Sequence, residues 1–285
     1  MSIQQMLLGA GGASPFMEAT GGDTITYSGD WKIHTYTTTG NSTFVVTSIG
    51  DGNQSIEYLV IAGGGGAGYT GEGQWTERNT GRPGGGAGGY RCSVVGEYSG
   101  GTSDATTSGT TSPAESVITP TVQSYTVTVG AGGGYGTDGD DSVFGSITSI
   151  GGGCGNAAGG SGGGGGTGTA QSGGGGAGTA YQGYDGGFGN GQYTKKGGGS
   201  GAGGQGLSGF TATNQCQDNY YGGAGRASSI TGSSVTRAYG GDNYRTNNWS
   251  GQRPDMPGGG GKHNADTGGN GPGQDGIVII RYKCQ

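Results

Sequence analysis

The sequence has little of what normally builds a protein core. Only 28% of its 285 residues are hydrophobic, 8% are aromatic, and 79 residues are glycine. Such a chain has few apolar side chains with which to build a conventional core. It also has few charges, with 11% charged residues and a net charge of -6, so little self-repulsion keeps it extended. Because the apolar residues cluster in short runs, we expect an ordered fold of unusual construction.

Clusters of basic residues and long apolar runs are also missing. A sequence pI near 4.8 and scattered Lys and Arg argue against nucleic acid as a partner. The longest apolar stretches, Tyr58 to Ala62 and Ile277 to Ile280, are far shorter than the ~20 residues that span a bilayer. The N-terminus has no basic region before its short apolar run, so a signal peptide is not predicted. We therefore expect folding in a cytoplasm and no membrane insertion.

The sequence shows no constellation that carries chemistry. Its four cysteines, Cys92, Cys154, Cys216 and Cys284, form no CxxC pair, so a zinc site is not predicted and free thiols are favoured over disulfides. Its two histidines, His34 and His263, lack readable partners for a metal or a triad. GxGxxG matches carry no information in so glycine-rich a chain. We predict a non-enzymatic protein with no cofactor, no metal and no catalytic residues.

Short runs of β-branched and aromatic residues predict the strands. They are bounded by turn residues, which is typical of antiparallel sheets. No window has helical spacing with a cap, so essentially no α-helix is expected. The predicted strands are Thr24 to Tyr27, Trp31 to Thr37, Thr43 to Thr47, Ile56 to Ala62, Ser124 to Val129, Val143 to Ile150 and Gly276 to Tyr282.

Several of these strands run directly into tracts of glycine, and this alternation organises the chain. The strand ending at Ala62 continues as GGGGAG, and the one ending at Val129 continues as GAGGG. We divide the chain into an N-terminal docking segment (1–20), a β-rich part with glycine tracts (21–150), a polyglycine region with aromatic loops (151–275) and a closing strand (276–285). The closing strand is expected to pair with the β-rich part.

The glycine tracts can form an extended helix with three residues per turn. This polyproline-II-type helix has no internal hydrogen bonds, so each N–H and C=O is available to a neighbour. Without Cβ atoms, such helices can approach closely and bond to one another. The tracts lack the every-third-residue glycine of collagen, and a flexible linker does not need the aromatic segments between them. The predicted fold class is mainly β, an antiparallel β-sandwich-like domain combined with a stack of polyglycine helices.

Six blocks in order resemble the glycine-rich domain of bacteriophage tail-fibre proteins, adhesins and related virion proteins. They are EYLVIAGGGGAG, PGGGAGGYRCSVV, SYTVTVGAGGG, DDSVFGSITSIGGGCG, SSITGSSVTRAYGGD and GQDGIVIIRY, and they span most of residues 56–282. The opening MSIQQMLLGAGGA is similar to the N-termini of other phage structural proteins. It suits a docking segment carried by Met6, Leu7 and Leu8, and a frayed tail is the alternative.

The resemblance implies that polyglycine helices form a rigid body and that loops at its tip contact the host. The matching loops are Tyr69 to Arg82, Tyr181 to Lys196, Asn214 to Tyr221 and Asp242 to Met256. Tyr and Trp offer rigid contact area with a polar tip. The candidate receptor-contact residues are Trp75, Tyr184, Tyr193, Tyr220, Tyr221, Tyr244 and Trp249. For each of them, covering the end of the glycine stack is an equally weighted alternative.

Two functions follow from this resemblance. The first is a tail-fibre or tip adhesin that recognises a host surface protein or glycan. The alternative is a scaffold or decoration protein of the capsid or tail without receptor binding. Both imply location in the virion, contacts with other virion subunits through the N-terminal segment, and a homo-oligomer, for which trimers are common among fibres. A depolymerase would need paired carboxylates in a groove, which the sequence does not indicate.

Overall fold

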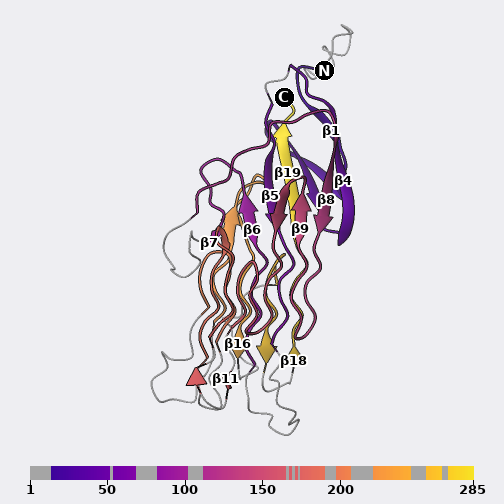
Figure 1. Cartoon of the computed structure of the whole chain (residues 1–285). Coiled ribbons are helices and arrows are strands. Elements are labelled where there is room, and N and C mark those ends of the chain that lie inside the picture. The colour runs from indigo at the N-terminus through magenta and orange to yellow at the C-terminus, as the bar shows by residue number, and fades with distance from the viewer. Residues whose placement is uncertain are drawn as a thin grey trace.

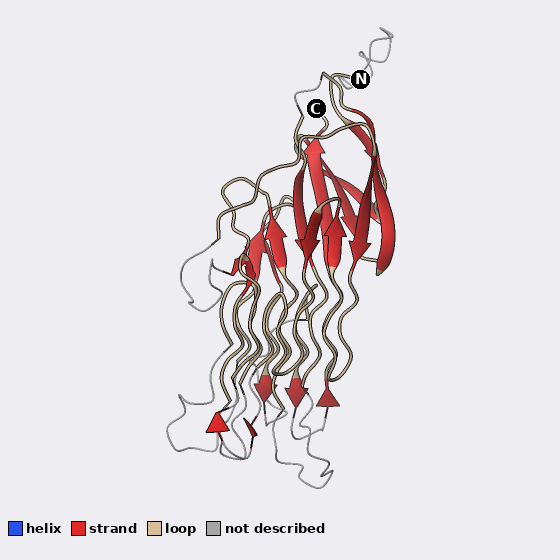
Figure 2. Ribbon diagram, in the orientation of Figure 1, coloured by secondary structure: helices blue, strands red, loops and turns tan. Residues whose placement is uncertain are grey.

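The computed structural model shows an elongated, mainly β protein with a β-sandwich at one end (Figure 1, Figure 2). Its strands belong mainly to antiparallel sheets, and the described residues contain no helix. This confirms the predicted fold class at the level of β-structure. The structure describes residues 14–51, 54–68, 82–101, 112–164, 167–168, 171–172, 174–189, 197–206, 221–244, 255–264 and 269–285.

Two five-stranded sheets form the sandwich. The first has the order β1-β4-β8-β9-β10 and the second the order β2-β3-β19-β5-β6. The strands of the first sheet are β1 (Glu18–Thr20), β4 (Gly40–Ser48), β8 (Ser124–Val129), β9 (Ser142–Phe144) and β10 (Ile147–Ser149). Those of the second are β2 (Thr24–Ser28), β3 (Trp31–Tyr36), β19 (Ile277–Lys283), β5 (Glu57–Ile61) and β6 (Tyr90–Cys92).

The closing strand β19 lies at the centre of the second sheet. It pairs antiparallel with β3 on one side and with β5 on the other. The first predicted strand, now β2, belongs to the same sheet through β3. Strands β3 and β4 are consecutive but lie in different sheets, so the chain changes sheet between them. The side chain of Asp23 accepts bonds from the backbone N–H groups of Thr37 and Thr38 where the chain crosses over, at 2.6 and 2.8 Å.

Both faces of the second sheet are buried, which explains its continuous apolar strands. One face packs on the first sheet, where Tyr58, Val278 and Tyr282 meet Phe44 and Phe144. The opposite face carries a second cluster. In that cluster Leu59, Ile61, Ile277 and Ile279 pack against residues from the glycine-rich part of the chain, namely Ala87, Ala202, Ile230 and Ala238. A strand buried on both faces needs no polar alternation.

Glycine-rich segments continue from the sandwich strands and run side by side along the rest of the molecule (Figure 1). Hydrogen bonds between their backbones join segments from both sides of residue 150, such as Gly86 to Gly153. We call these segments the glycine stack. They comprise residues 62–68, 83–89, 130–140, 150–164, 174–187, 197–206, 221–225, 238–242, 257–262 and 271–276.

Hydrogen-bond partners in the stack change with a period of three residues. In the segment 63–68, residues 63 and 66 donate to segment 137–140, residues 64 and 67 to segment 271–274, and residues 65 and 68 to segment 83–86. Segment 84–89 repeats the pattern, donating in turn to 197–200, 258–261 and 150–153. Three residues per turn is the repeat of the extended helix that the sequence predicts.

Carbonyl groups of segment 63–68 accept bonds from two further segments and from a second stretch of segment 130–140. Gly63, Gly64 and Gly65 accept bonds from Gly152, Gly133 and Gly261. Segment 63–68 thus bonds to five other segments of the stack, and backbone polar groups that would be costly to bury unpaired are satisfied without side chains.

Aspartate side chains complete the network where no backbone carbonyl is in reach. Each accepts a bond from a backbone N–H of the stack, at 2.7–2.8 Å. The donor and acceptor residues are Gly132 and Asp275, Gly151 and Asp141, Cys154 and Asp138, Gly178 and Asp185, and Gly222 and Asp242.

Replacing Asp242 tests this role. Asp242 is fully buried, and its Oδ1 accepts from the Gly222 N–H at 2.7 Å. Asp242→Ala should lower the free energy of unfolding by about 1–3 kcal/mol, because a buried N–H loses its acceptor. Asp242→Asn keeps an acceptor oxygen and should cost less than about half as much. Equal losses in urea unfolding would contradict the assignment.

Four small sheets complete the structure. The pair β7 (Gly100–Gly101) and β13 (Gln182–Gly183) is parallel, and the pair β14 (Arg226–Ser228) and β15 (Val235–Arg237) is an antiparallel hairpin. The antiparallel pair β11 (Thr167–Gly168) and β12 (Gln171–Ser172) is separate from the sheet of β16 (Asn243–Tyr244), β17 (His263–Asn264) and β18 (Gly269–Asn270). β11, β16 and β18 lie at the end of the stack remote from the sandwich (Figure 1), which we call the distal end.

Candidate functional site

The two ends of the molecule differ in what they present. The C-terminus lies at the sandwich end, where the Cys284 N–H donates to the Asp30 carbonyl and the Gln285 side chain donates to Gly29. The first described residues lie at the same end, since Pro15 accepts from the Asp51 N–H. Both described termini therefore lie opposite the distal end (Figure 2).

The flanks of three candidate loops meet at the distal end of the stack. Gly68 donates to Pro83 across the segment 69–81, and Gly187 donates to Gly198 across 190–196. Gly206 packs against Gly198, which in turn packs against Tyr221, the residue that follows segment 207–220. The chain thus leaves the stack and returns to it at neighbouring points.

The fourth candidate loop, Asp242 to Met256, differs from the other three because its two ends lie in different parts of the molecule. Its first strand, β16, lies at the distal end (Figure 1). Its last residues are followed by Pro257, which accepts from Ala238, and by Gly258, which packs against Ile61 of the sandwich. This segment therefore begins at the distal end and ends beside the sandwich.

Most predicted contact and docking residues lie outside the described part of the chain. Three contact candidates, Tyr184, Tyr221 and Tyr244, lie within it. Tyr244 belongs to β16 at the distal end, and Tyr221 is 37% exposed at the start of a stack segment. Those outside the described residues are Trp75, Tyr193, Tyr220, Trp249 and the docking residues Met6, Leu7 and Leu8.

Tyr184 is the exception, and its position corrects the prediction. Its side chain is only 1% exposed, so it offers no surface to a receptor. Its carbonyl accepts bonds from the Gly162 N–H and the Ser200 hydroxyl. The segment 184–187 is a member of the stack, and only the later part of the predicted loop Tyr181 to Lys196 can lie outside it. Whether an aromatic residue between glycines is buried depends on the packing of its tract against other tracts, which is not visible in the sequence.

A compact polar cluster lies beneath the distal end. The Arg82 guanidinium lies over the Tyr135 ring, 4.8 Å from its centroid, and the Arg82 N–H donates to His263 Nδ1 at 3.3 Å. Lys262 pairs with Asp255 at 2.7 Å. Burial of His263, and secondarily the charge of Arg82, lowers the pKa of His263 to about 4. The ring is therefore neutral at neutral pH, and Nδ1 is its acceptor.

Neutral His263 predicts a loss of stability in mild acid. The unfolded chain gains a proton near pH 6.5 and the folded chain only near pH 4, so stability is complete above about pH 6.5 and falls as the pH drops towards 4. One such proton gives a slope of up to about 1.4 kcal/mol per pH unit. Urea unfolding across this range should show the slope. His263→Gln should reduce it, and an unchanged slope would contradict this role.

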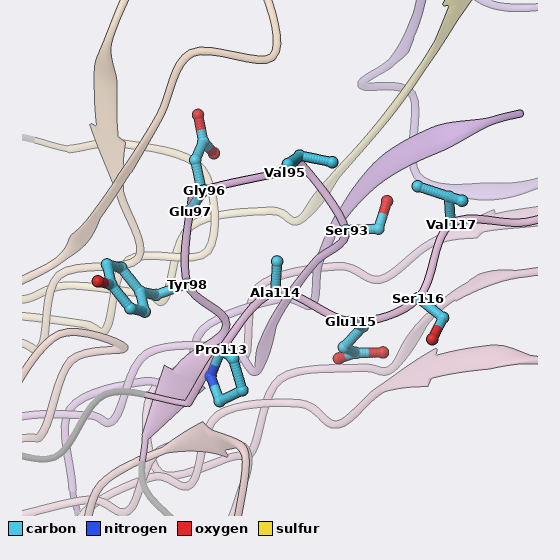
Figure 3. A pocket seen from close by; sticks show the side chains of 10 residues that line it. All are labelled: Ser93, Val95, Gly96, Glu97, Tyr98, Pro113, Ala114, Glu115, Ser116 and Val117. Carbon is cyan, nitrogen blue, oxygen red and sulfur yellow. The ribbon is translucent and has the colours of Figure 1, made fainter.

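An open groove lies on the flank of the sandwich, between the turn 93–98 and the segment 113–117 (Figure 3). The exposed side chains of Val95, Val117 and Tyr98 give it an apolar lining. Its two carboxylates have internal partners. Glu115 accepts from Arg91 and Tyr58, and Glu97 accepts from the N–H and hydroxyl of Ser229.

The carboxylates of the groove are poor candidates for acid–base chemistry. Burial raises the pKa of Glu97, but bonds from Ser228 and Ser229 outweigh it, so the net pKa lies below the ordinary value. Glu115 forms an ion pair with Arg91 at 2.6 Å. Both carboxylates are thus already engaged in structural bonds.

Other chemical features are few in the part of the chain that the structure describes. No group of His, Cys, Asp and Glu there could hold a metal ion. Cys92, Cys154 and Cys284 are free, whereas Cys216 lies outside the described residues. Burial raises the pKa of Cys92 to about 12 and of Cys154 to about 11, so neither is a reactive thiolate. No helix among the described residues has the length and apolar character needed to traverse a bilayer.

Comparison with known proteins gives one match. A family model described as a glycine-rich domain matches residues 37–283, which include most of the sandwich and the whole glycine stack. Comparison with curated proteins gives no match, and comparison with solved structures gives none.

Proposed function

The chain belongs to the glycine-rich domain family, and from this premise we propose that it is a non-enzymatic structural protein of a phage virion. In this role it is a tail-fibre or tip adhesin that contributes to recognition of a host surface protein or glycan. The glycine stack, built of polyproline-II-type helices, is the rigid body that carries the recognition loops.

The separation of the two ends is the observation that supports this proposal. Both described termini lie at the sandwich, and the flanks of the segments 69–81, 190–196 and 207–220 meet at the opposite end. A subunit attached through its N-terminal segment would thus present these loops away from the attachment point. Loops positioned by a rigid scaffold are the usual carriers of binding.

The edge of the second sheet suits assembly with other subunits. β2 is one of its two outermost strands, and Ile25 and Tyr27 are 43% and 67% exposed. An exposed strand edge with apolar side chains is a template for pairing with another chain. This feature supports a homo-oligomer or a contact with another virion subunit.

Adsorption of phage to its host tests the proposal. Virions carrying Trp75→Ala together with Trp249→Ala should adsorb at least tenfold more slowly, because aromatic residues dominate contact energy. Tyr181→Asn is the matched control, since Tyr181 is 54% exposed but lies in the turn before β13, away from the distal end. Its positive φ of 62° tolerates asparagine.

Labelling of the assembled particle distinguishes the alternative function. Immunogold label at the fibre tips agrees with an adhesin. Label on the capsid or tail shaft, together with unchanged adsorption of the double variant, would instead identify a scaffold or decoration protein.

A further inference from the structure

Two arginines oppose each other in the hairpin of β14 and β15. Arg226 pairs directly with Arg237 in the antiparallel register. Directly opposed residues of such a ladder project from the same face. Ser228, two residues along β14, is buried, whereas Ala227 is exposed, so this face is turned into the molecule. The hairpin therefore places two positive charges side by side on its inner face.

These arginines differ from the two arginines of the second sheet in having no acidic partner. Arg91 pairs with Glu115, and Arg281 pairs with Glu57. Within the described ranges, Arg226 and Arg237 form no ion pair.

Backbone carbonyls accept only long hydrogen bonds from Arg226 and Arg237. Arg226 Nη2 donates to the Ala202 carbonyl and Arg237 Nη1 to the Val235 carbonyl, both at 3.4 Å. Arg226 Nε is buried and has no acceptor in the described part of the structure. Several donors of the two guanidinium groups thus remain available to an acceptor from outside.

Burial makes the missing counter-charge costly. Arg237 is only 6% exposed, and desolvation lowers its pKa. Opposed like charges also repel each other. Buried cations are normally paired with an anion, and the loss of a partner is strongly unfavourable. The hairpin would therefore be stabilised by an anion bound between the two side chains.

Arg226, on one side of the site, lies beside the partly exposed Tyr98. Arg226 lies 5.9 Å from the centroid of the Tyr98 ring, and that ring is 46% exposed at the edge of the groove (Figure 3). The neighbouring carboxylate of Glu97 is occupied by Ser229. Entry of an anion beside Tyr98 would thus displace no ion pair.

We propose that Arg226 and Arg237 form a binding site for a phosphate- or sulfate-type oxyanion. A guanidinium presents its N–H donors as a planar fork that matches the oxygens of such a group. Two forks on one hairpin face can hold one oxyanion from two sides. The free inorganic ion and the phosphate ester of a sugar share this chemistry. The proposal is independent of the position of the protein in a virion.

Isothermal titration calorimetry of the full chain with sodium phosphate, at constant ionic strength, tests the site. We expect saturable binding with a dissociation constant of about 1 mM or lower. Arg226→Gln with Arg237→Gln should weaken it at least tenfold, whereas Lys283→Gln, which removes an exposed cation elsewhere, should not. Glucose 6-phosphate and glucose are titrated into the protein in separate experiments. Tighter binding of the ester than of phosphate identifies a sugar phosphate as the ligand, and no heat is expected with glucose.

Thermal unfolding shows whether the double glutamine variant is folded. Because the two charges lack acidic partners, the double glutamine variant should unfold at the wild-type temperature or higher in phosphate-free buffer. The absence of saturable heat with the wild-type protein would overturn the proposal. So would equal affinity in a double variant that unfolds cooperatively.

Discussion

Replacing Gly85 with alanine is expected to lower the free energy of unfolding by about 3 kcal/mol or more. A Cβ at this position would overlap the carbonyl group of Gly65 in the neighbouring stack segment. The obstacle is backbone, and it is held in place by the bond from Gly261 to the same carbonyl. Overpacking of ordinary cores costs about 1–3 kcal/mol where side chains can shift. Here the clash is with a backbone carbonyl that cannot move as a side chain can, so the loss of stability should lie at the upper end of that range or above it.

Gly134→Ala is the matched control in the same stack. Gly134 is exposed, and a Cβ there would meet only the Thr137 hydroxyl, at 3.5 Å. This change should be neutral, or stabilise by up to about 1 kcal/mol, because alanine reduces the freedom of the unfolded chain. Denaturant unfolding of both variants gives the comparison. Similar free energies for the two variants would mean that the segments do not pack as closely as described.

Arg281→Met should be the most damaging change to the sandwich, at about 3–5 kcal/mol. Arg281 Nε and Nη2 both lie 2.6 Å from Glu57 Oε2, and Arg281 Nη1 donates to the carbonyls of Ser229 and Ile230. Its guanidinium also lies 4.4 Å from the centroid of the Trp31 ring. Methionine would leave the Glu57 carboxylate, whose side chain is 7% exposed, buried without its partner.

A double variant separates the ion pair from simple packing. Adding Glu57→Leu to Arg281→Met removes the buried charge, so much of the lost stability should return. Guanidinium chloride unfolding of the single and double variants gives the coupling energy. A single variant that costs less than about 1 kcal/mol, or a double variant as unstable as the single one, would show that the pair does not hold the second sheet together.

Local residue preference was sufficient to predict the long strands of the sandwich. Six of the seven predicted runs contain one observed strand each, since β-branched and aromatic residues between turns fit a pleated surface. Val143 to Ile150 is different, because Gly145, at a φ of 58°, turns the chain between β9 and β10. A glycine inside an apolar run is a signal for such a hairpin, whereas residue preference alone predicts a single strand here.

Short strands and partner choice depend on packing that a single sequence does not reveal. β6 consists of Tyr90–Cys92 and is held by pairing with β5. β14 and β15 have three residues each, and β14 (Arg-Ala-Ser) has weak strand preference. The change of sheet between β3 and β4 depends on tertiary contacts, one of which is the Asp23 side chain. Each of these features depends on residues distant in the chain.

The candidate site was predictable as a set of segments and less so as individual residues. The flanks of the glycine-poor segments 69–81 and 207–220 lie at the distal end, whereas the segments themselves lie outside the described residues, so the loops stay predictions. Tyr184 was misjudged because burial in a stack depends on neighbours that contribute no side chains. The aspartate acceptors and the opposed arginines have no sequence signature, because both arise from the register of segments brought together by folding.

Backbone hydrogen bonding in the glycine stack is the central claim, and amide hydrogen exchange measured by NMR tests it most directly. The amides of segments 63–68 and 84–89 donate to other segments, so they should exchange with opening free energies close to those of β19. Such protection is not expected of glycine in a flexible linker. If these amides exchange at unfolded-chain rates while β19 stays protected, the stack is not held by its backbone and the account is wrong.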